Sequence, residues 1–161
     1  MKNRYLFLLA VALPVILLDQ ATKLLVVRKL EYHESITVIG NFFDIIHARN
    51  PGAAFSFLSN SSFRLPFLIT VSLVASIAVI AIYRKLMPEQ KLTALSLSLI
   101  LGGAVGNLID RIRLGEVIDF LNVHWYQHYW PAFNVADSAL CVGVGLLAVD
   151  MIREERRKKR Q

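Results

Sequence analysis

Four long apolar stretches, separated by short polar segments, dominate the pattern of the chain. Residues 65–83 and 92–109 contain no charged side chain, and each is about as long as the roughly 20 residues that cross a hydrocarbon core. Residues 5–27 and 133–151 have a similar length but include ionisable side chains. We therefore expect an all-α integral membrane protein, a single domain covering all 161 residues, with transmembrane helices at about residues 5–27, 65–83, 92–111 and 133–151.

The polar segment between the first two spans shows signs of a small ordered structure. Apolar runs lie on both sides of Gly40-Asn41, which predicts a β-hairpin. Pro51 and Gly52 then turn the chain, and residues 53–58 are expected to form a short interfacial helix.

The polar segment after the third span runs over residues 111–131 and ends in the sequence HWYQHYWP. Two tryptophans and two tyrosines in so short a stretch are typical of an aromatic belt at a membrane surface. The basic tail, residues 153–161, is the one segment that we expect to be disordered.

The composition agrees with a membrane protein, and the charges predict its orientation. The chain is 55% hydrophobic and 19% charged, which is too apolar for an ordinary soluble domain. Four spans put both termini on the same side as the loop after the second span, and most lysines and arginines lie on that side. The termini are therefore expected in the cytoplasm, and the two longer polar segments outside it. The net charge of +6 is then explained by topology and contact with membrane lipid, and no nucleic-acid partner is expected.

Ionisable residues inside a membrane span are costly and need a reason. Asp19 and Lys23 are four residues apart and lie on one face of the first span. They can form a salt bridge that holds this helix, or they can line a site and orient another group.

Asp119 and Asp137 lie in apolar surroundings without a cation beside them in the sequence. The third span leaves the membrane on the face where the fourth enters it, so a short segment can bring both carboxyl groups together. Two adjacent carboxyl groups share one proton, so one can activate water while the other hydrogen-bonds to a scissile carbonyl. The alternative is structural: Asp119 caps a turn, and Asp137 bonds a neighbouring helix.

The end of the third span combines small and polar residues. Gly102 and Gly106 predict a close helix–helix approach. Asn107, Asp110 and Arg111 share one helix face. Arg111 can reach the membrane surface, or it can bind a substrate carbonyl while Asp110 fixes its direction. Two further polar residues, which can cap turns or contact a substrate, lie near the same boundary: Asn50 and Asn134.

Other hydrolytic chemistries lack their usual residues in this sequence. There is no HExxH pair, and His124 and His128 have helical spacing without an evident third ligand, so no metal and no cofactor are expected. Cys141 has no histidine near it in the sequence. The alternative to acid–base hydrolysis is a small transporter or assembly subunit that uses intramembrane acids as a proton or ion relay.

Five segments together resemble a known family. They are DQATK (residues 19–23), RNPGAAF (49–55), GNLIDR (106–111), GEVIDF (115–120) and FNVADS (133–138). In content and order they are similar to the signature blocks of lipoprotein signal peptidase, also called signal peptidase II. Residues 122–129 are the part that we do not align with the family.

The resemblance implies both an activity and a set of residues. Members are aspartyl proteases of the bacterial inner membrane that remove signal peptides from diacylglyceryl-modified prolipoproteins, cutting before the lipidated cysteine near the extracytoplasmic face. It also implies an extracytoplasmic β-cradle, and we expect a monomer. Asp119 and Asp137 match the catalytic pair. The residues that match substrate-binding or supporting positions are Asp19, Lys23, Asn50, Gly52, Asn107, Asp110, Arg111 and Asn134.

Overall fold

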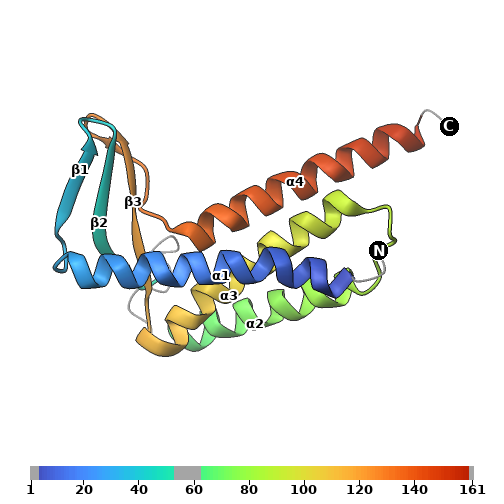
Figure 1. Cartoon of the computed structure of the whole chain (residues 1–161), viewed down its shortest axis with the longest axis horizontal. Coiled ribbons are helices and arrows are strands. Elements are labelled where there is room, and N and C mark those ends of the chain that lie inside the picture. The colour runs from blue at the N-terminus through green and yellow to red at the C-terminus, as the bar shows by residue number, and fades with distance from the viewer. Residues whose placement is uncertain (1–3, 53–62, 160–161) are drawn as a thin grey trace.

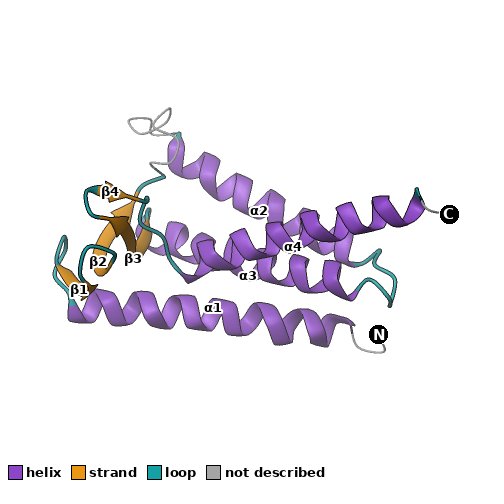
Figure 2. Cartoon of the chain, turned by 90° about the horizontal axis from the view of Figure 1, so that it is seen from above, coloured by secondary structure: helices purple, strands orange, loops and turns teal. Residues whose placement is uncertain are grey.

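The computed structural model describes residues 4–52 and 63–159, which form a helical bundle with a small sheet at one end (Figures 1 and 2). The helices are α1 (Arg4–Lys29), α2 (Arg64–Tyr83), α3 (Lys91–Leu114) and α4 (Val135–Lys158). Each is long and apolar enough to cross a membrane. This confirms the four predicted spans.

α3 is the central helix of the bundle. More than half of its apolar stretch is buried, 56%, against 17% or less for each of the other three helices. α1, α2 and α4 all pack against α3, and α4 also contacts α1. The apolar surface that α1, α2 and α4 leave exposed is suited to contact lipid.

Glycines on α3 allow the neighbouring helices to approach closely. A Cβ on Gly102 would lie 2.9 Å from the Cβ of Val15 on α1. A Cβ on Gly103 would overlap the carbonyl of Ala136 on α4, and one on Gly106 would lie 2.8 Å from Oδ2 of Asp19. The predicted close approach at Gly102 and Gly106 is therefore confirmed, and Gly103 adds a third contact point.

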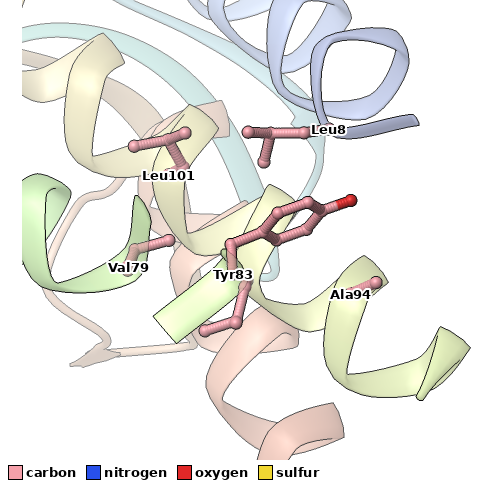
Figure 3. Close-up of a cluster of buried hydrophobic side chains, with 6 residues drawn as sticks. Leu8, Val79, Tyr83, Ala94 and Leu101 are labelled. Carbon is pink, nitrogen blue, oxygen red and sulfur yellow. The ribbon is translucent and has the colours of Figure 1, made fainter. Parts of the chain in front are cut away.

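At the end of the bundle away from the sheet, buried side chains of α1, α2 and α3 meet around Tyr83 (Figure 3). The Tyr83 hydroxyl donates a hydrogen bond to the carbonyl of Arg4, 2.8 Å away. This end is closed by packing, so the polar chemistry is concentrated at the other end.

The sheet is antiparallel, with its strands in the order β1 (Ser35–Ile39), β2 (Phe43–Asn50), β3 (Val117–Trp125) and β4 (His128–Tyr129). β1 and β2 form the predicted hairpin around Gly40-Asn41. β3 was not predicted: it pairs with β2 across a long sequence separation and brings Asp119 opposite Ala48. The predicted interfacial helix at residues 53–58 lies outside the described residues.

Two helix ends differ from the predicted bounds. α3 continues to Leu114, where Gly115 takes a left-handed φ of 78° and donates to the carbonyl of Arg111. α4 continues to Lys158, so the disorder expected for the basic tail is wrong over residues 153–158. Glu, Arg and Lys are good helix formers, and bases at a helix C-terminus complement its dipole.

Candidate functional site

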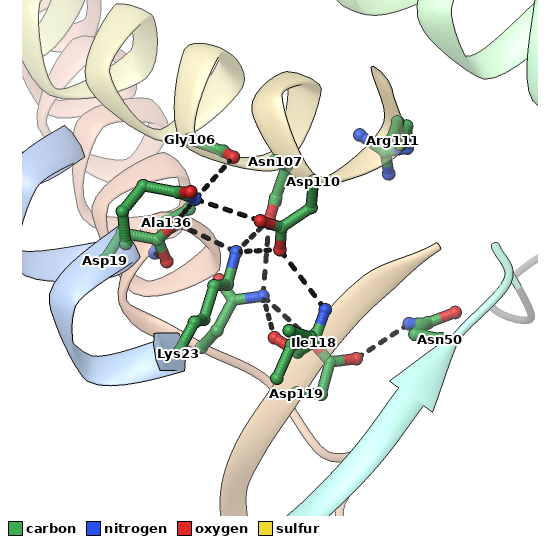
Figure 4. A network of polar contacts seen from close by, with 12 residues as sticks. Asp19, Lys23, Asn50, Gly106, Asn107, Asp110, Arg111, Ile118, Asp119 and Ala136 are labelled. Atoms are coloured by element: carbon green, nitrogen blue, oxygen red, sulfur yellow. Dashed lines mark hydrogen bonds and ion pairs between the residues drawn. The ribbon is translucent and has the colours of Figure 1, made fainter. Parts of the chain in front are cut away.

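A buried ion cluster lies where α1 and α3 approach the sheet (Figure 4). Nζ of Lys23 is 2.8 Å from Oδ2 of Asp19 and 2.8 Å from Oδ2 of Asp110. It also donates to Oδ1 of Asn107 at 3.0 Å, and only 2% of Lys23 is exposed. The predicted Asp19–Lys23 pair is confirmed, but it is part of a cluster in which one cation serves two acids.

The two acids of this cluster each hold a neighbouring segment. Oδ1 of Asp19 accepts a hydrogen bond from the backbone N–H of Ala136 at 2.9 Å. Oδ2 of Asp110 accepts one from the N–H of Ile118 at 3.2 Å. Ala136 directly precedes Asp137, and Ile118 directly precedes Asp119. The cluster therefore fixes the backbone beside both candidate catalytic residues.

Gln20 is a part of this cluster that the sequence reasoning missed. Its side-chain amide donates to Oδ1 of Asp110 at 3.0 Å and to the carbonyl of Gly106 at 3.2 Å. A neutral amide beside Asp19 in a membrane span was the available signal. Gln20 thus binds α1 to α3 beside the ion cluster.

Asp119, on β3, is held by two side-chain amides. Its Oδ2 accepts from Nδ2 of Asn50 at 2.9 Å, and its Oδ1 accepts from Nδ2 of Asn134 at 2.7 Å. The Asn50 oxygen accepts from the N–H of Gly52 at 2.8 Å, where φ is 101°. Gly52 therefore turns the donor end of Asn50 towards Asp119.

Asp137 lies in the first turn of α4. Asn134 is the N-cap: its side-chain oxygen accepts from the N–H of Asp137 at 2.9 Å, and its own N–H donates to Oδ2 of Asp137 at 3.2 Å. Oδ1 of Asp137 accepts from Nδ2 of Asn107 at 2.7 Å. Asp137 thus makes the bond to a neighbouring helix that was considered as its structural role, and it also completes the capping box of α4.

Asn134 joins the two candidate catalytic residues. It bonds Asp119 through its side chain and Asp137 through both its side chain and its backbone. Over residues 4–52 and 63–159, no ion pair involves either aspartate. The structure therefore brings the two carboxyl groups to one asparagine without a bonded cation.

The burial of Asp119 changes its acidity. Burial, its largest cause, raises the pKa of the Asp119 carboxyl to about 6, and the nearby charge of Asp137 also raises it. The amides of Asn50 and Asn134 and the charge of Lys23 act in the opposite direction. A carboxyl group with this pKa can carry a proton near neutral pH.

Arg111 lies apart from the ion cluster (Figure 4). Its guanidinium donates to the hydroxyl of Ser72 on α2 at 3.3 Å, a partner that the sequence reasoning did not identify. In one of the two roles considered for Arg111, Asp110 fixes its direction. In the structure the hydrogen-bond and ion-pair partners of the Asp110 carboxylate are Lys23, Gln20 and the Ile118 N–H, so no direct bond joins Asp110 to Arg111 among the described residues.

The described part of the chain offers no cluster of three or more histidine, cysteine or acidic side chains that could hold a metal ion. His124 lies at the end of β3, near Asp44, and His128 lies in β4. Their spacing of four in the sequence is therefore not helical spacing in the structure.

A bundle of four membrane-spanning helices with an acidic, amide-lined site at one end defines an integral membrane protein built for polar chemistry at a membrane boundary. The sequence profile of the family described as Signal peptidase (SPase) II matches residues 11–153. The chain belongs to the signal peptidase II family and is therefore a membrane-embedded protease.

Individual relatives agree with this assignment. The lipoprotein signal peptidase of Geobacter metallireducens is 59% identical over 99% of this chain and 99% of its own length. That of Geobacter sulfurreducens is 60% identical over 98% of this chain and 99% of its own. A solved bacterial membrane enzyme, determined by the in meso method at 2.3 Å resolution, superposes with a TM-score of 0.86 at 30% identity, covering 96% of this chain and 93% of that one.

Proposed function

We propose that this protease is an aspartyl endopeptidase in which Asp119 and Asp137 are the catalytic pair. The observation that carries the proposal is the division of the four acids at this end of the bundle. Asp19 and Asp110 form ion pairs with Lys23, whereas Asp119 and Asp137 are bonded by amide donors alone among the described residues, and both bond Asn134. Carboxyl groups left without a bonded cation near an apolar boundary are free to exchange a proton.

The chemistry requires one proton on the pair. In this proposal Asp119 is the residue that carries it: burial raises the pKa of its carboxyl to about 6, so part of the population is protonated near neutral pH. The Asp137 carboxylate removes a proton from water as the water oxygen attacks the scissile carbonyl carbon, and the Asp119 proton passes to the carbonyl oxygen. The tetrahedral intermediate then collapses: the C–N bond breaks, the Asp137 proton goes to the leaving amine, and Asp119 regains its own from the intermediate. The reaction is a hydrolysis and involves no oxidation or reduction.

The substrate class follows from family membership. Relatives over the full chain are named lipoprotein signal peptidases, so the substrate is a bacterial prolipoprotein whose cysteine carries diacylglycerol and whose signal peptide is removed before that cysteine. A cysteine with two acyl chains stays at the membrane surface, and this suits a catalytic pair at the end of a helical bundle.

The neighbouring polar groups have positioning and binding roles in this proposal. Asn50, Asn107 and Asn134 fix the carboxyl oxygens of the pair. Arg111 has only the neutral Ser72 hydroxyl as a hydrogen-bond partner in the described chain, so its guanidinium can also bind a peptide carbonyl of the substrate.

The alternative, a proton or ion relay, has less support. A relay needs ionisable groups along the depth of the membrane, and residues 5–18, 92–106 and 138–149 contain no Asp, Glu, Lys, Arg or His. The four acids Asp19, Asp110, Asp119 and Asp137 lie together at the sheet end of the bundle, as hydrolysis at one boundary requires.

Replacing one aspartate of the pair by asparagine tests the proposal. Asp119→Asn and Asp137→Asn should each lower kcat for cleavage of a lipidated prolipoprotein by about 10³-fold or more, because proton transfer is lost. The matched control is Asp150→Asn. Asp150 lies on α4 as well, but it accepts a hydrogen bond from Thr93 towards the opposite end, so cleavage should stay near the parental rate.

Each variant must remain inserted and folded, which size-exclusion profiles and thermal unfolding in detergent would check. Cleavage at the parental rate by either Asp119→Asn or Asp137→Asn would remove that residue from the mechanism.

A further inference from the structure

The outer half of the sheet has an unusual surface for a protein segment that faces water. This sheet tip consists of residues 35–43 and 122–131, and it contains no Asp, Glu, Lys or Arg. Every residue of β1 is exposed, and Ile36, Val38 and Ile39 are each more than half exposed. Edge strands in water are normally protected by charged side chains, so this edge needs an apolar cover.

Aromatic side chains gather at the same place. The most exposed large side chains of the tip are Trp125 at 65% and Trp130 at 68%. Phe42, Tyr126 and Tyr129 are also exposed. Rings with one polar atom are the side chains that membrane proteins place at the headgroup level of the bilayer.

The two turns of the sheet tip form one unit. The N–H of His124 donates to the carbonyl of Phe42 at 2.8 Å, and the N–H of Tyr126 donates to the carbonyl of Asn41 at 3.1 Å. Inside the tip, His124 stacks on Tyr129 with ring centroids 4.8 Å apart. The aromatic side chains are therefore presented by an ordered surface.

The arrangement of the elements places this surface beside the membrane. β1, β2 and β3 run across the ends of the helices, and the turn between β1 and β2 projects past the first turn of α4 (Figure 1). Helices that cross a membrane run close to its normal, so strands perpendicular to them run along its surface. The sheet tip then extends sideways over lipid.

From these observations we infer that the sheet tip rests on the lipid surface, with its aromatic side chains in the headgroup layer of the leaflet at which the sheet lies. The partner is the boundary between phospholipid headgroups and acyl chains. Because Asp119 lies on β3, whose far end carries Trp125, contact of the tip with lipid fixes the height of the Asp119 carboxyl relative to that boundary. The inference depends on membrane insertion and not on the identity of the catalytic pair.

Trp125 and Trp130 are the two tryptophans of the chain, so intrinsic tryptophan fluorescence reports on the tip alone. The full chain is reconstituted into phosphatidylcholine vesicles whose acyl chains are brominated either near the headgroup or near the terminal methyl group. We expect strong quenching by the shallow bromines, weak quenching by the deep ones, and an iodide Stern–Volmer constant below roughly half that of free tryptophan amide.

Two results would overturn the inference. The first is full iodide quenching without quenching by either brominated lipid, which would place the tip in water. The second is protection from iodide without lipid quenching and with dependence on protein concentration, which would identify a second copy of the chain as the cover. Trp125→Phe and Trp130→Phe separate the two signals and keep the aromatic surface.

A second measurement links the surface to catalysis. Trp125→Glu with Trp130→Glu should raise KM several-fold for a lipidated substrate embedded in vesicles and leave kcat/KM in short-chain detergent micelles unchanged. The control is the double phenylalanine variant, which should behave like the parent in both. An equal loss of kcat/KM in vesicles and in micelles would contradict a role for lipid contact in positioning the site. The fluorescence experiment does not depend on whether Asp119 and Asp137 are catalytic.

Discussion

At the scale of single residues, Lys23 determines the role of two acids of the site, because Asp19 and Asp110 form ion pairs with it and so serve as structural groups. It lies within 2.8 Å of both Asp19 and Asp110, and all three side chains are almost completely buried. Removing one partner of a buried ion pair destabilises the fold, because the other partner is left as an uncompensated buried charge. Lys23 thereby allows Asp19 and Asp110 to hold the N–H groups of Ala136 and Ile118.

The first prediction concerns this lysine. Lys23→Met should lower the free energy of unfolding by about 3–5 kcal/mol, because Asp19 and Asp110 then remain buried without a cation. Thermal or denaturant unfolding in detergent would measure it. The control is Lys159→Met, which removes an exposed partner of Glu155 and should produce no measurable change. Equal unfolding midpoints for the two variants would contradict the role of the cluster.

A second residue-scale prediction uses the acidity of Asp119. The pKa of its carboxyl is about 6, and the hydrogen bond from Asn50 favours the charged form and so lowers this value. If the proton on Asp119 is needed, kcat/KM falls as pH rises through that pKa. Asn50→Ala removes the donor and so raises the pKa of Asp119. The alkaline limb of the pH profile, where kcat/KM falls, should therefore move to higher pH by about one unit, whether or not the maximal rate changes.

The pH profile of Asn122→Ala is the control for this experiment. Asn122 lies on the same strand as Asp119 but donates to Asp44 at 3.3 Å, so its loss should leave the limb in place. An alkaline limb that stays in place or moves downward in Asn50→Ala would mean that this limb does not report the proton on Asp119.

The residues of the site could be named from the sequence, but their partners could not. Polar side chains in apolar spans are conspicuous, and the resemblance to the family assigned them together. Which cation meets which acid depends on how α1 packs on α3, so the pairing of Asp110 with Lys23 instead of Arg111 was not predictable. Ser72 was missed because it looks equivalent to Thr70 and Ser76 on the same helix. All three hydroxyls donate to carbonyls of α2, and Ser72 in addition accepts from Arg111.

At the scale of elements, the close approach of α4 to α3 positions Asp137. Gly103 on α3 faces the carbonyl of Ala136, the residue before Asp137. Gly143, farther along α4, would meet the carbonyl of Ser96 at 2.8 Å if it had a Cβ. The helices are thus in backbone contact along their length, which leaves little freedom for the first turn of α4.

The third prediction tests this contact. Gly103→Ala should push α4 away from α3, lower the free energy of unfolding by about 1–3 kcal/mol, and reduce the cleavage rate. Gly145→Ala is the matched control, because nothing lies within 4 Å of its added methyl group and alanine favours a helix by up to about 1 kcal/mol. Unfolding and cleavage assays on both proteins would decide. A Gly103→Ala protein as active as Gly145→Ala would show that the spacing is not critical.

Most of the elements were predictable from local patterns, and the exceptions have a common cause. The four spans follow from uninterrupted apolar runs, and the hairpin follows from the Gly40-Asn41 turn. β3 escaped prediction because residues 117–120 are all buried, so the strand lacks the alternation of a half-exposed one. Its pairing with β2 depends on contacts between distant parts of the chain, which a local pattern does not contain.

At the scale of the whole molecule, the two ends of the bundle differ in charge. The end without the sheet carries Arg84, Lys85 and the basic last turns of α4, whereas the sheet end holds the buried acids. We propose that the end without the sheet faces the cytoplasm, since membrane proteins retain lysine and arginine there. The carboxyl pair then lies near the extracytoplasmic face.

The fourth prediction tests this orientation. A reporter that is active only outside the cytoplasm, such as alkaline phosphatase, should be inactive when fused after Gln161. A fluorescent protein that folds in the cytoplasm should be bright at the same position. A second pair of fusions, truncated after Tyr83 and after Leu114, should report the cytoplasm and the outside respectively. An active phosphatase after Gln161 would invert the molecule and move the site to the inner face.

Asn134 has a consequence for how this protein can vary. One short side chain begins α4 and touches both carboxyl groups. Serine at this position would still start the helix but would not span the two acids, and aspartate would add a third negative charge. An inhibitor that takes its main hydrogen bonds from Asn134 would therefore leave the bacterium few substitutions by which to gain resistance.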